Sequence, residues 1–191
     1  MSMSESKSSE DEIFNCQSTS LTESTSNLPF WDLRQYMWEL KSGNFGPIER
    51  LKTLLVNLRL RIESLVLGKK SVRIRGRYRS TPLVSSNLRS GDFVQVKTKE
   101  EIMATLDPKG RNRGLDFKPE MLKYCGERFR VFKRLDKMIN EKTGKMRQIR
   151  NTVILEGVTC DGISHSGCQR NCYCLWREAW LRRISSDEPA G

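Results

Sequence analysis

Apolar residues recur at helical spacing in the first third of this chain. Phe30, Leu33, Met37 and Leu40 lie three or four residues apart after Pro29, and this spacing predicts a short amphipathic helix. A second apolar face, about five turns long, consists of Ile48, Leu51, Leu54, Leu55, Leu58, Ile62, Leu65 and Val66. We therefore expect a helical pair at residues 29–68. The 48–66 helix should face either the core or a partner, which includes a second copy of the chain in a homodimer.

Cations alternate with apolar residues directly after this region, from residue 69 to residue 79. If these residues form a strand, Val72, Ile74 and Tyr78 lie on one face and the arginines lie on the other. Such a ribbon could bind phosphate groups, with Tyr78 available for stacking. A solvated linker explains the same composition equally well. Residues 69–90 are thus a basic strand or a basic linker.

From residue 91 onward the pattern changes to short strand-like runs separated by turns. The runs that predict strands are Phe93–Lys97, Phe129–Lys133, Lys137–Ile139, Met146–Arg150 and Val153–Leu155. Thr98 and Glu101 form a capping-box pattern for a brief helix through Leu106, and residues 107–110 and 141–144 have turn sequences. Several short strands with frequent turns indicate an α+β fold, built on a small SH3-like β-barrel or a bent antiparallel sheet.

The end of the chain returns to helical spacing. Trp176, Ala179, Trp180 and Ile184 lie three or four residues apart, and arginines flank them. We expect a C-terminal helix that packs its tryptophans on the sheet and completes a β-rich domain at residues 91–185. Residues 186–191 should be disordered.

Charge is unevenly distributed along the 191 residues. The formal net charge is +11, but residues 1–28 contain five acids and one lysine, so residues 29–191 carry +11 − (−4) = +15. The acidic, Ser/Thr-rich segment 1–28 has no apolar period and is predicted to be a disordered tail. The basic remainder favours an anionic partner, either a nucleic acid or an acidic protein. The arginines expected to contact this partner are Arg73, Arg75, Arg77, Arg79, Arg111 and Arg113.

The chain has no sequence feature that directs it to a membrane. No run of about 18 apolar residues is present, and the N-terminus lacks the basic start and apolar stretch of a secretory signal. We therefore expect a cytoplasmic protein. In a reducing cytoplasm, six cysteines are better explained as metal ligands, buried residues or reactive thiols than as disulfides.

Soft metal donors are concentrated near the C-terminus. Cys160, His165, Cys168, Cys172 and Cys174 lie within fifteen residues, and His165 is the only histidine. A closed zinc site needs four such donors, so we expect zinc, or iron as the alternative, to pin the C-terminal helix to the sheet. The predicted ligands are Cys125, Cys160 and Cys168, with Cys172 and His165 as candidates for the fourth position. Buried reduced cysteines are the alternative explanation.

Motifs between about Asp32 and Arg183 resemble a family of uncharacterised bacterial proteins, some of them encoded beside biosynthetic genes. The matching segments are Asp32-Leu-Arg-Gln-Tyr36, Leu40-x-Ser-Gly-Asn44, Glu100-Glu-Ile-Met-Ala-Thr-Leu-Asp107, Gly110-Arg-Asn-Arg-Gly-Leu115, Glu120-Met-Leu-x-Tyr-Cys-Gly126, Glu141-Lys-Thr-Gly-Lys-Met146, Leu155-Glu-Gly-Val-x-Cys160 and Trp176-Arg-Glu-x-Trp-Leu181. The resemblance implies a shared fold without an established activity. It also implies a three-thiolate site at Cys125, Cys160 and Cys168 with a variable or open fourth position. The family usually has Cys-Pro-Arg where this chain reads Cys168-Gln169-Arg170.

Three functions are compatible with these features. The leading hypothesis is a non-enzymatic, metal-stabilised basic binding module or accessory protein that engages an anionic or acidic macromolecule. The second is a small metalloenzyme of a biosynthetic pathway using an open metal position, or a cysteine-dependent enzyme with Cys172 as nucleophile at a helix N-terminus and His165 as base. The third is a scaffold subunit that holds a biosynthetic enzyme through Trp31, Trp38 and the 48–66 helix. Paired-carboxylate, phosphate-loop and nucleotide-binding motifs are absent, so glycosidase, kinase and dehydrogenase chemistry is unsupported.

Overall fold

The structure is a computed structural model that describes residues 17–18, 21–29, 81–162, 165 and 168–185, together with single positions between residues 32 and 78. Contacts between Cα atoms divide the chain into two compact units. One comprises Met1–Asp32 and Leu135–Arg150, and the other comprises Leu33–Arg134 and Asn151–Gly191. The five segments predicted from the sequence, 1–28, 29–68, 69–90, 91–185 and 186–191, stay a prediction.

The first unit contains a helical turn and the end of a β-hairpin. Helix α1, Leu21–Ser24, lies inside the segment predicted to be disordered, and the hydroxyl groups of Ser24 and Thr25 donate to the Leu21 carbonyl. In the hairpin turn, the Gly144 N–H donates to the Asn140 carbonyl at 2.8 Å. Gly144 has a φ of 69°, which glycine adopts without a steric penalty. The predicted turn at residues 141–144 is therefore confirmed.

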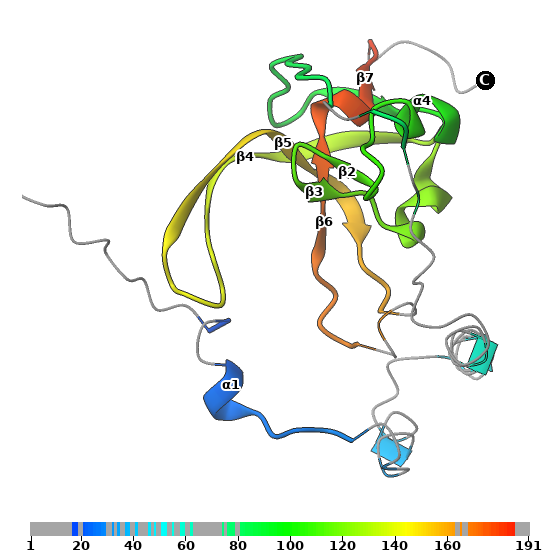
Figure 1. Cartoon of the computed structure of the whole chain (residues 1–191), viewed down its shortest axis with the longest axis vertical. Helices are drawn as coiled ribbons and strands as arrows, with labels where there is room; N and C mark the ends of the chain where they lie inside the picture. The colour runs from blue at the N-terminus through cyan, green and yellow to red at the C-terminus, as the bar shows by residue number, and fades with distance from the viewer. Residues whose placement is uncertain are drawn as a thin grey trace, which may run out of the picture. The chain divides into compact units, whose positions relative to one another are not determined.

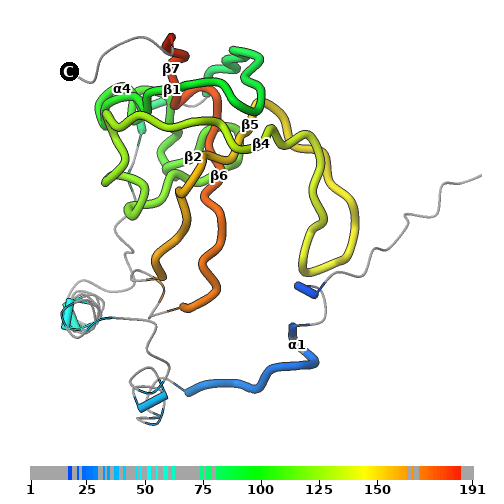
Figure 2. The backbone as a smooth tube through the Cα atoms, turned by 180° about the vertical axis from the view of Figure 1, so that it is seen from behind, coloured from blue at the N-terminus to red at the C-terminus, as the bar shows by residue number. Residues whose placement is uncertain are grey.

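The second unit is built on a five-stranded sheet (Figures 1 and 2). Its strands are β1 (Phe93–Val96), β4 (Arg128–Ile139), β5 (Met146–Thr159), β6 (Tyr173–Arg177) and β7 (Leu181–Arg183), in the order β6-β5-β4-β1-β7. The residues of β4 and β5 that fall within Leu135–Arg150 belong to the first unit. β1 is antiparallel to both β4 and β7, and β5 is antiparallel to β6. The predicted alternative of an antiparallel sheet is confirmed. The predicted closed barrel is not seen, because the described strands leave β6 and β7 as edges of the sheet.

Alternation along β1 shows why this strand forms. Val94 and Val96 are fully buried, whereas Phe93, the first residue of the strand, is 42% exposed. Val94 pairs with Phe129 of β4 and Phe93 pairs with Arg130, so the two strands share an apolar inner face and a mixed outer face. β1 thus carries the two-residue period predicted for a half-buried strand.

The connection between β1 and β4 contains the smaller elements. α4 (Lys99–Met103) begins with a capping box: the Glu101 N–H donates to the Thr98 hydroxyl, and the Thr98 N–H donates to the Glu101 carboxylate. A turn at Asp107–Gly110 then leads into a two-stranded sheet of β2 (Arg111–Asn112) and β3 (Leu115–Asp116). The 3₁₀ helix η1 (Pro119–Tyr124) follows. The predicted capping box and turn are confirmed, although α4 ends before Leu106.

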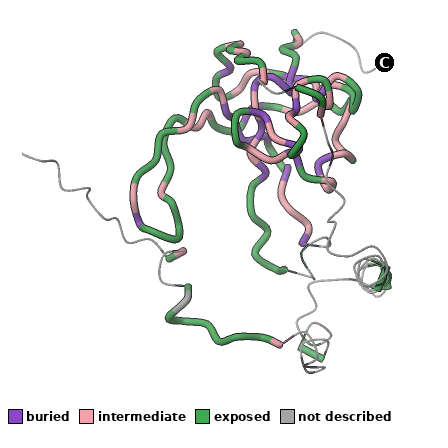
Figure 3. Tube along the Cα trace, viewed as in Figure 1, coloured by how far each residue is buried: buried purple, intermediate pink, exposed green. Residues whose placement is uncertain are grey.

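Aromatic residues fill the core on the inner face of the sheet. Trp176 and Trp180 are completely buried, and Phe117 contacts both in edge-to-face geometry, with ring centroids 6.2 and 5.2 Å apart. The indole N–H of Trp180 donates to the Thr105 hydroxyl at 3.1 Å. Figure 3 shows that the buried segments collect in the sheet and in the connection from β6 to β7. The core therefore depends on the C-terminal residues.

The predicted C-terminal helix is wrong. Residues 173–177 form strand β6, Glu178–Trp180 form the 3₁₀ helix η3, and residues 181–183 form strand β7. The two tryptophans do face the core as expected. Trp176 in β6 and Trp180 in η3 are four residues apart, and the 3₁₀ turn between them brings both side chains to the same side of the chain. A spacing of four residues therefore fits this strand and turn as well as it fits an α-helix.

The predicted N-terminal helical pair lies largely outside the described residues. The described backbone is helical at positions 34, 37, 38, 41, 48, 51, 52, 55, 58, 59 and 62. In the 69–79 segment, Gly76 and Tyr78 donate backbone hydrogen bonds to the carbonyls of Asp107 and Leu106, and Ile74 is buried in the core. Among the described residues, no helix has the length and apolar character to cross a membrane.

Candidate functional site

The loop between β5 and β6 gathers the cysteine-rich segment. Gly162 has a φ of 71°, and a Cβ added there would stand 2.0 Å from the Cys168 carbonyl oxygen. Glycine therefore allows the two arms of the loop to approach closely. The Cys160 N–H donates to the Cys172 carbonyl at 2.7 Å, which extends the pairing of the two arms. The sequence thus brings Cys160 beside Cys172 without a disulfide.

The 3₁₀ helix η1 supplies the other side of this corner. Lys123 pairs with Asp161 at 2.6 Å, and the Tyr124 hydroxyl donates to the Thr159 carbonyl at 3.3 Å. Both contacts hold η1 against the end of β5. Glu120, one turn earlier on η1, is thereby placed next to the cysteine loop.

Glu120, Cys160 and His165 form the candidate metal centre. One ligand atom from each residue lies within 4.8 Å of the other two. Cys160 Sγ is 3.3 Å from His165 Nδ1, and the Gly162 N–H donates to the same sulfur at 3.4 Å. Thiolate, imidazole and carboxylate are all zinc ligands, so the donor chemistry fits the predicted metal. We call these three residues the Glu-Cys-His cluster.

Burial raises the pKa values of the neighbouring thiols. Desolvation is the main cause at Cys160, where the Glu120 and Asp161 carboxylates add to it and the hydrogen bond from Gly162 opposes it. Burial also raises the pKa of Cys174 to about 11. Without a bound cation, these groups are neutral thiols at neutral pH. A metal would have to displace the Cys160 proton on binding.

The other predicted ligands lie outside the Glu-Cys-His cluster. Cys125 is half-buried and packs against the core, and burial raises the pKa of its thiol. Cys168 and Cys172 are exposed. Cys172 precedes strand β6, so the helix N-terminus expected to activate it is not there. Their roles as ligands stay predictions.

Sequence reasoning missed Glu120 as a metal donor. The acids of this chain are numerous, and none is singled out by spacing from the cysteines. The available signal was the position of Glu120 four residues before Tyr124-Cys125, in a segment already expected to approach the site. Glu120 is brought to the site only by the way η1 packs against the cysteine loop.

The outer face of the sheet forms a second candidate site. Phe132 of β4 and Tyr173 of β6 stack with ring centroids 5.8 Å apart and planes inclined by 20°, although β5 lies between their strands. Phe132 remains 47% exposed and Tyr173 51%. On β1, Phe93 lies beneath the Arg130 guanidinium, 5.9 Å from its ring centroid. We call Phe93, Arg130, Phe132 and Tyr173 the outer aromatic face.

Cations predominate on the strands of the sheet. The five strands contain ten arginines and lysines but only two acids, Asp136 and Glu156. The fold also neutralises some of these cations internally: Arg134 pairs with Glu178, Arg182 with Glu101 and Arg183 with Asp92. Arg130 is exposed beside the aromatic rings, and Lys133 is exposed on the opposite face of β4 from Phe132. The strongest combination of aromatic and positive groups thus lies on β4.

The arginines predicted to contact an anion differ in exposure and in pairing. Arg77 and Arg113 are exposed, and Arg111 pairs with Asp116 at 2.8 Å. Arg73, Arg75 and Arg79 lie outside the described residues. Sequence reasoning missed Arg130, although Arg128 and Arg130 alternate with Phe129 and Val131 in the printed sequence.

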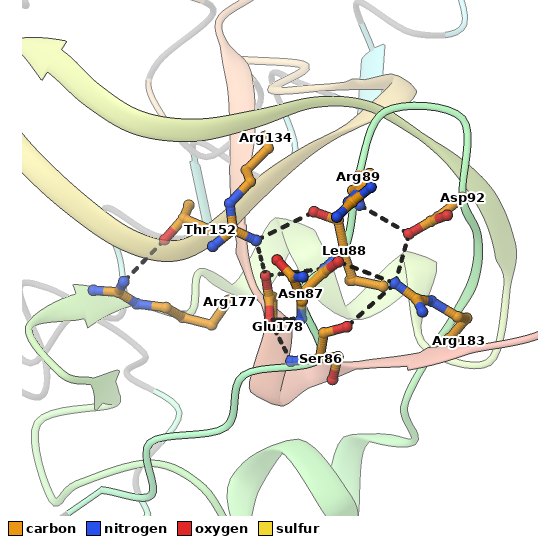
Figure 4. A network of polar contacts seen from close by, with 10 residues as sticks. All are labelled: Ser86, Asn87, Leu88, Arg89, Asp92, Arg134, Thr152, Arg177, Glu178 and Arg183. Carbon is orange, nitrogen blue, oxygen red and sulfur yellow. Dashed lines mark hydrogen bonds and ion pairs between the residues drawn. The ribbon is translucent and has the colours of Figure 1, made fainter.

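A buried carboxylate fixes the segment that leads into β1 (Figure 4). Glu178 is fully buried and accepts hydrogen bonds from the backbone N–H groups of Ser86, Asn87 and Leu88 at 2.5, 3.0 and 3.3 Å. Arg134 completes the site at 2.5 Å. Because each donor points at the carboxylate, this network is a structural anchor rather than an open site.

Comparisons with protein-family models, curated proteins and solved structures find no match to this chain. The resemblance to the bacterial family therefore stays a prediction.

Proposed function

We propose that this protein is a non-enzymatic, metal-stabilised binding module that engages an anionic macromolecule. The observation that carries the proposal is the excess of cations on the sheet, ten against two acids. Such a field raises the local concentration of a polyanion and accelerates its association. The charge of +15 on residues 29–191 supports the same reading for the larger part of the chain.

Polyanion binding by the full chain tests this proposal. We expect heparin and oligonucleotides to bind, with an affinity that falls linearly on a log–log plot against salt concentration. Replacing Lys133 and Arg130 by glutamine should weaken both ligands and reduce the salt slope, by roughly one for each phosphate contact removed. Failure of all polyanions to bind at about 50 mM salt would contradict the proposal.

Zinc, with iron as the alternative, is proposed to stabilise the loop between β5 and β6. The support is the convergence of the Glu-Cys-His cluster, with Cys172 held beside Cys160 by a backbone hydrogen bond. Bound zinc would cross-link η1 to the cysteine loop and so add to the stability of the fold. It would also provide the open position required by the metalloenzyme alternative, if one ligand is water.

Metal analysis of protein purified without a histidine tag tests this part. We expect about one zinc per chain by the stoichiometry of such sites, and its loss in Cys160→Ser and Glu120→Ala. Cys125→Ser is the matched variant, because Cys125 is a predicted ligand outside the cluster. Metal loss in Cys125→Ser but not in Glu120→Ala would favour the three-cysteine set. Iron in the pure protein would favour the enzyme.

The topology supports an SH3-like architecture as a finer proposal. The support for this proposal is the strand order β6-β5-β4-β1-β7 together with the 3₁₀ helix η3 between β6 and β7. Fold alone does not specify the ligand.

The scaffold or homodimer alternative is favoured by one observation. Ile48, Leu51, Leu55, Leu58 and Ile62 are each more than half exposed and follow a spacing of three and four residues. That spacing is the apolar seam of a coiled coil, and the exposed Lys52 and Arg59 stand beside it. Light scattering across a concentration series tests self-association. A monomeric mass at every concentration, unchanged by Leu55→Lys, would exclude the homodimer. The exposed apolar residues would then have to contact a different protein.

A further inference from the structure

We propose that the outer aromatic face binds single-stranded nucleic acid, with its rings stacking on bases and the adjacent cations contacting phosphates. This inference rests on the proposed function, because it names the polyanion and locates its contacts. It adds a stacking component, which a general basic surface does not have.

Half-exposed aromatic rings are the first observation. Phe93, Phe132 and Tyr173 are 42%, 47% and 51% exposed, although the last two already contact each other. Side chains of this size are usually buried, and here three of them come from strands β1, β4 and β6 of one sheet. Their contacts within the protein leave roughly half of each residue's surface in water. A flat ligand could cover that surface.

The arrangement of charge is the second observation. Arg130 lies between Phe93 and Phe132 in the sheet, because it pairs directly with Phe93 and precedes Phe132 by two residues on the same face. Its Nε donates to the Gly91 carbonyl at 3.3 Å, and its guanidinium stands over the Phe93 ring. The cation is thus oriented beside the rings before any ligand arrives. Arg128 lies two residues before Arg130 on the same face of β4.

These features favour single-stranded nucleic acid over other anions. Every base has a π-face, and stacking of a base on an exposed aromatic side chain contributes to affinity regardless of sequence. An acidic protein or a sulfated polysaccharide would use the cations but has no repeated flat group for the rings. In a duplex the bases stack on each other, so their faces are not accessible to side chains on a sheet.

Fluorescence anisotropy with the full chain and labelled oligonucleotides tests the inference. The probes are a twelve-nucleotide single strand of DNA, its RNA counterpart and an abasic strand with the same number of phosphates. We expect the base-containing strands to bind more tightly than the abasic strand. Tyr173→Ala and Phe132→Ala should each weaken them by about 5- to 150-fold, the range reported for loss of one stacked base. Neither substitution should change the salt slope, because no cation is removed.

Three control variants keep the result interpretable. Tyr173→Phe preserves the ring and should bind like the parent protein. Phe93→Ala removes a ring that is not part of the Phe132–Tyr173 stack, so it reports on stacking even if the loss of that pair weakens the fold. Leu83→Ala removes an exposed apolar side chain, 62% exposed, that lies outside the sheet and outside every predicted contact. It should have no effect.

Two outcomes would overturn the inference while leaving the proposed function intact. Equal affinity for abasic and base-containing strands would show that phosphates alone are recognised. Preference for heparin or for an acidic polypeptide, unchanged by Phe93→Ala and Tyr173→Ala, would assign the surface to another polyanion. Absence of binding to every polyanion would instead reject the proposed function itself.

Discussion

Substitution of Glu178 should destabilise the fold more than any other single change among the described acids. Its carboxylate is completely buried and accepts four hydrogen bonds, three from consecutive backbone N–H groups and one from Arg134. Glu178→Ala removes the acceptor and leaves all four donors behind. The residues that carry those donors come from two regions distant in sequence, so the network joins the segment before β1 and strand β4 to η3 (Figure 4).

The expected magnitude follows from the number and burial of these donors. Leaving a buried donor unpaired costs about 1–3 kcal/mol, and the lower figure applies here because Ser86, Asn87 and Arg134 are partly exposed. Three backbone donors then cost about 3 kcal/mol. Removing one partner of a buried ion pair costs about 3–5 kcal/mol, in the same range. We therefore expect the free energy of unfolding to fall by about 3–5 kcal/mol, a large part of the roughly 5–15 kcal/mol typical of a domain.

Urea unfolding followed by tryptophan fluorescence and circular dichroism measures this loss. Glu178→Gln keeps the shape and one acceptor oxygen, so it should cost less than the alanine variant, about 2 kcal/mol for a hydrogen bond to a charged group. Glu156→Ala, at an exposed position of β5, is the matched control and should stay within about 0.5 kcal/mol of the parent. A loss of less than about 1 kcal/mol in Glu178→Ala would refute the reasoning, because it would mean that the donors find water.

Three further changes follow from local geometry. Gly76→Ala should lower the free energy of unfolding in urea by about 1–3 kcal/mol, because the added Cβ would stand 1.8 Å from the Leu106 carbonyl oxygen. Gly46→Ala is the control, because no atom lies within 4 Å of a Cβ added there. Equal losses of stability in the two variants would contradict this account. Hydrogen bonds from Arg111 and Lys118 outweigh burial and lower the pKa of Asp116 in the folded protein, so this group stabilises the fold above about pH 4 and loses that contribution as the pH falls through the lowered pKa. The carboxyl is partly exposed, so its contribution to the free energy of unfolding should stay below about 1 kcal/mol. Asp116→Asn should therefore reduce the loss of stability at acidic pH. An unchanged dependence of stability on pH would contradict the role given to Asp116. Thr105→Val should cost about 1–3 kcal/mol by leaving the buried Trp180 indole N–H unpaired, whereas Thr105→Ser should retain most of the stability if the hydroxyl is what matters.

Local sequence signals predicted the parts of the fold that depend on short-range chemistry. Thr98 and Glu101 identified the start of α4, because the capping box requires only residues three apart. Asp107 and Gly110 identified a turn for the same reason. The central hairpin was recognised from alternating residues on either side of the turn at Gly144. It was divided into four runs, whereas the structure has two continuous strands.

The candidate sites were harder to predict, because their residues meet only in three dimensions. Cys160 and His165 are near in sequence, and His165 was one of the two candidates for the fourth ligand position. Glu120 joins them because η1 packs on the end of β5 through Lys123 and Tyr124, contacts that no spacing encodes. The outer aromatic face has the same origin. Phe132 and Tyr173 are separated by forty-one positions, and their stacking depends on the order of β4, β5 and β6 in the sheet.

The C-terminal segment shows why helical spacing misled the sequence interpretation. In an α-helix, Glu178 and Arg182 would be four residues apart on one face and could form an ordinary surface ion pair. In the structure, Arg182 instead forms an ion pair with Glu101, and Glu178 forms one with Arg134. Both partners are far away in sequence. Glu178 is drawn into the interior because three backbone N–H groups at residues 86–88 need an acceptor there. Satisfying those donors requires the chain to turn at η3, and that turn starts the edge strand β7 beside β1. The long-range requirement of the segment before β1 therefore outweighs the local preference for a helix.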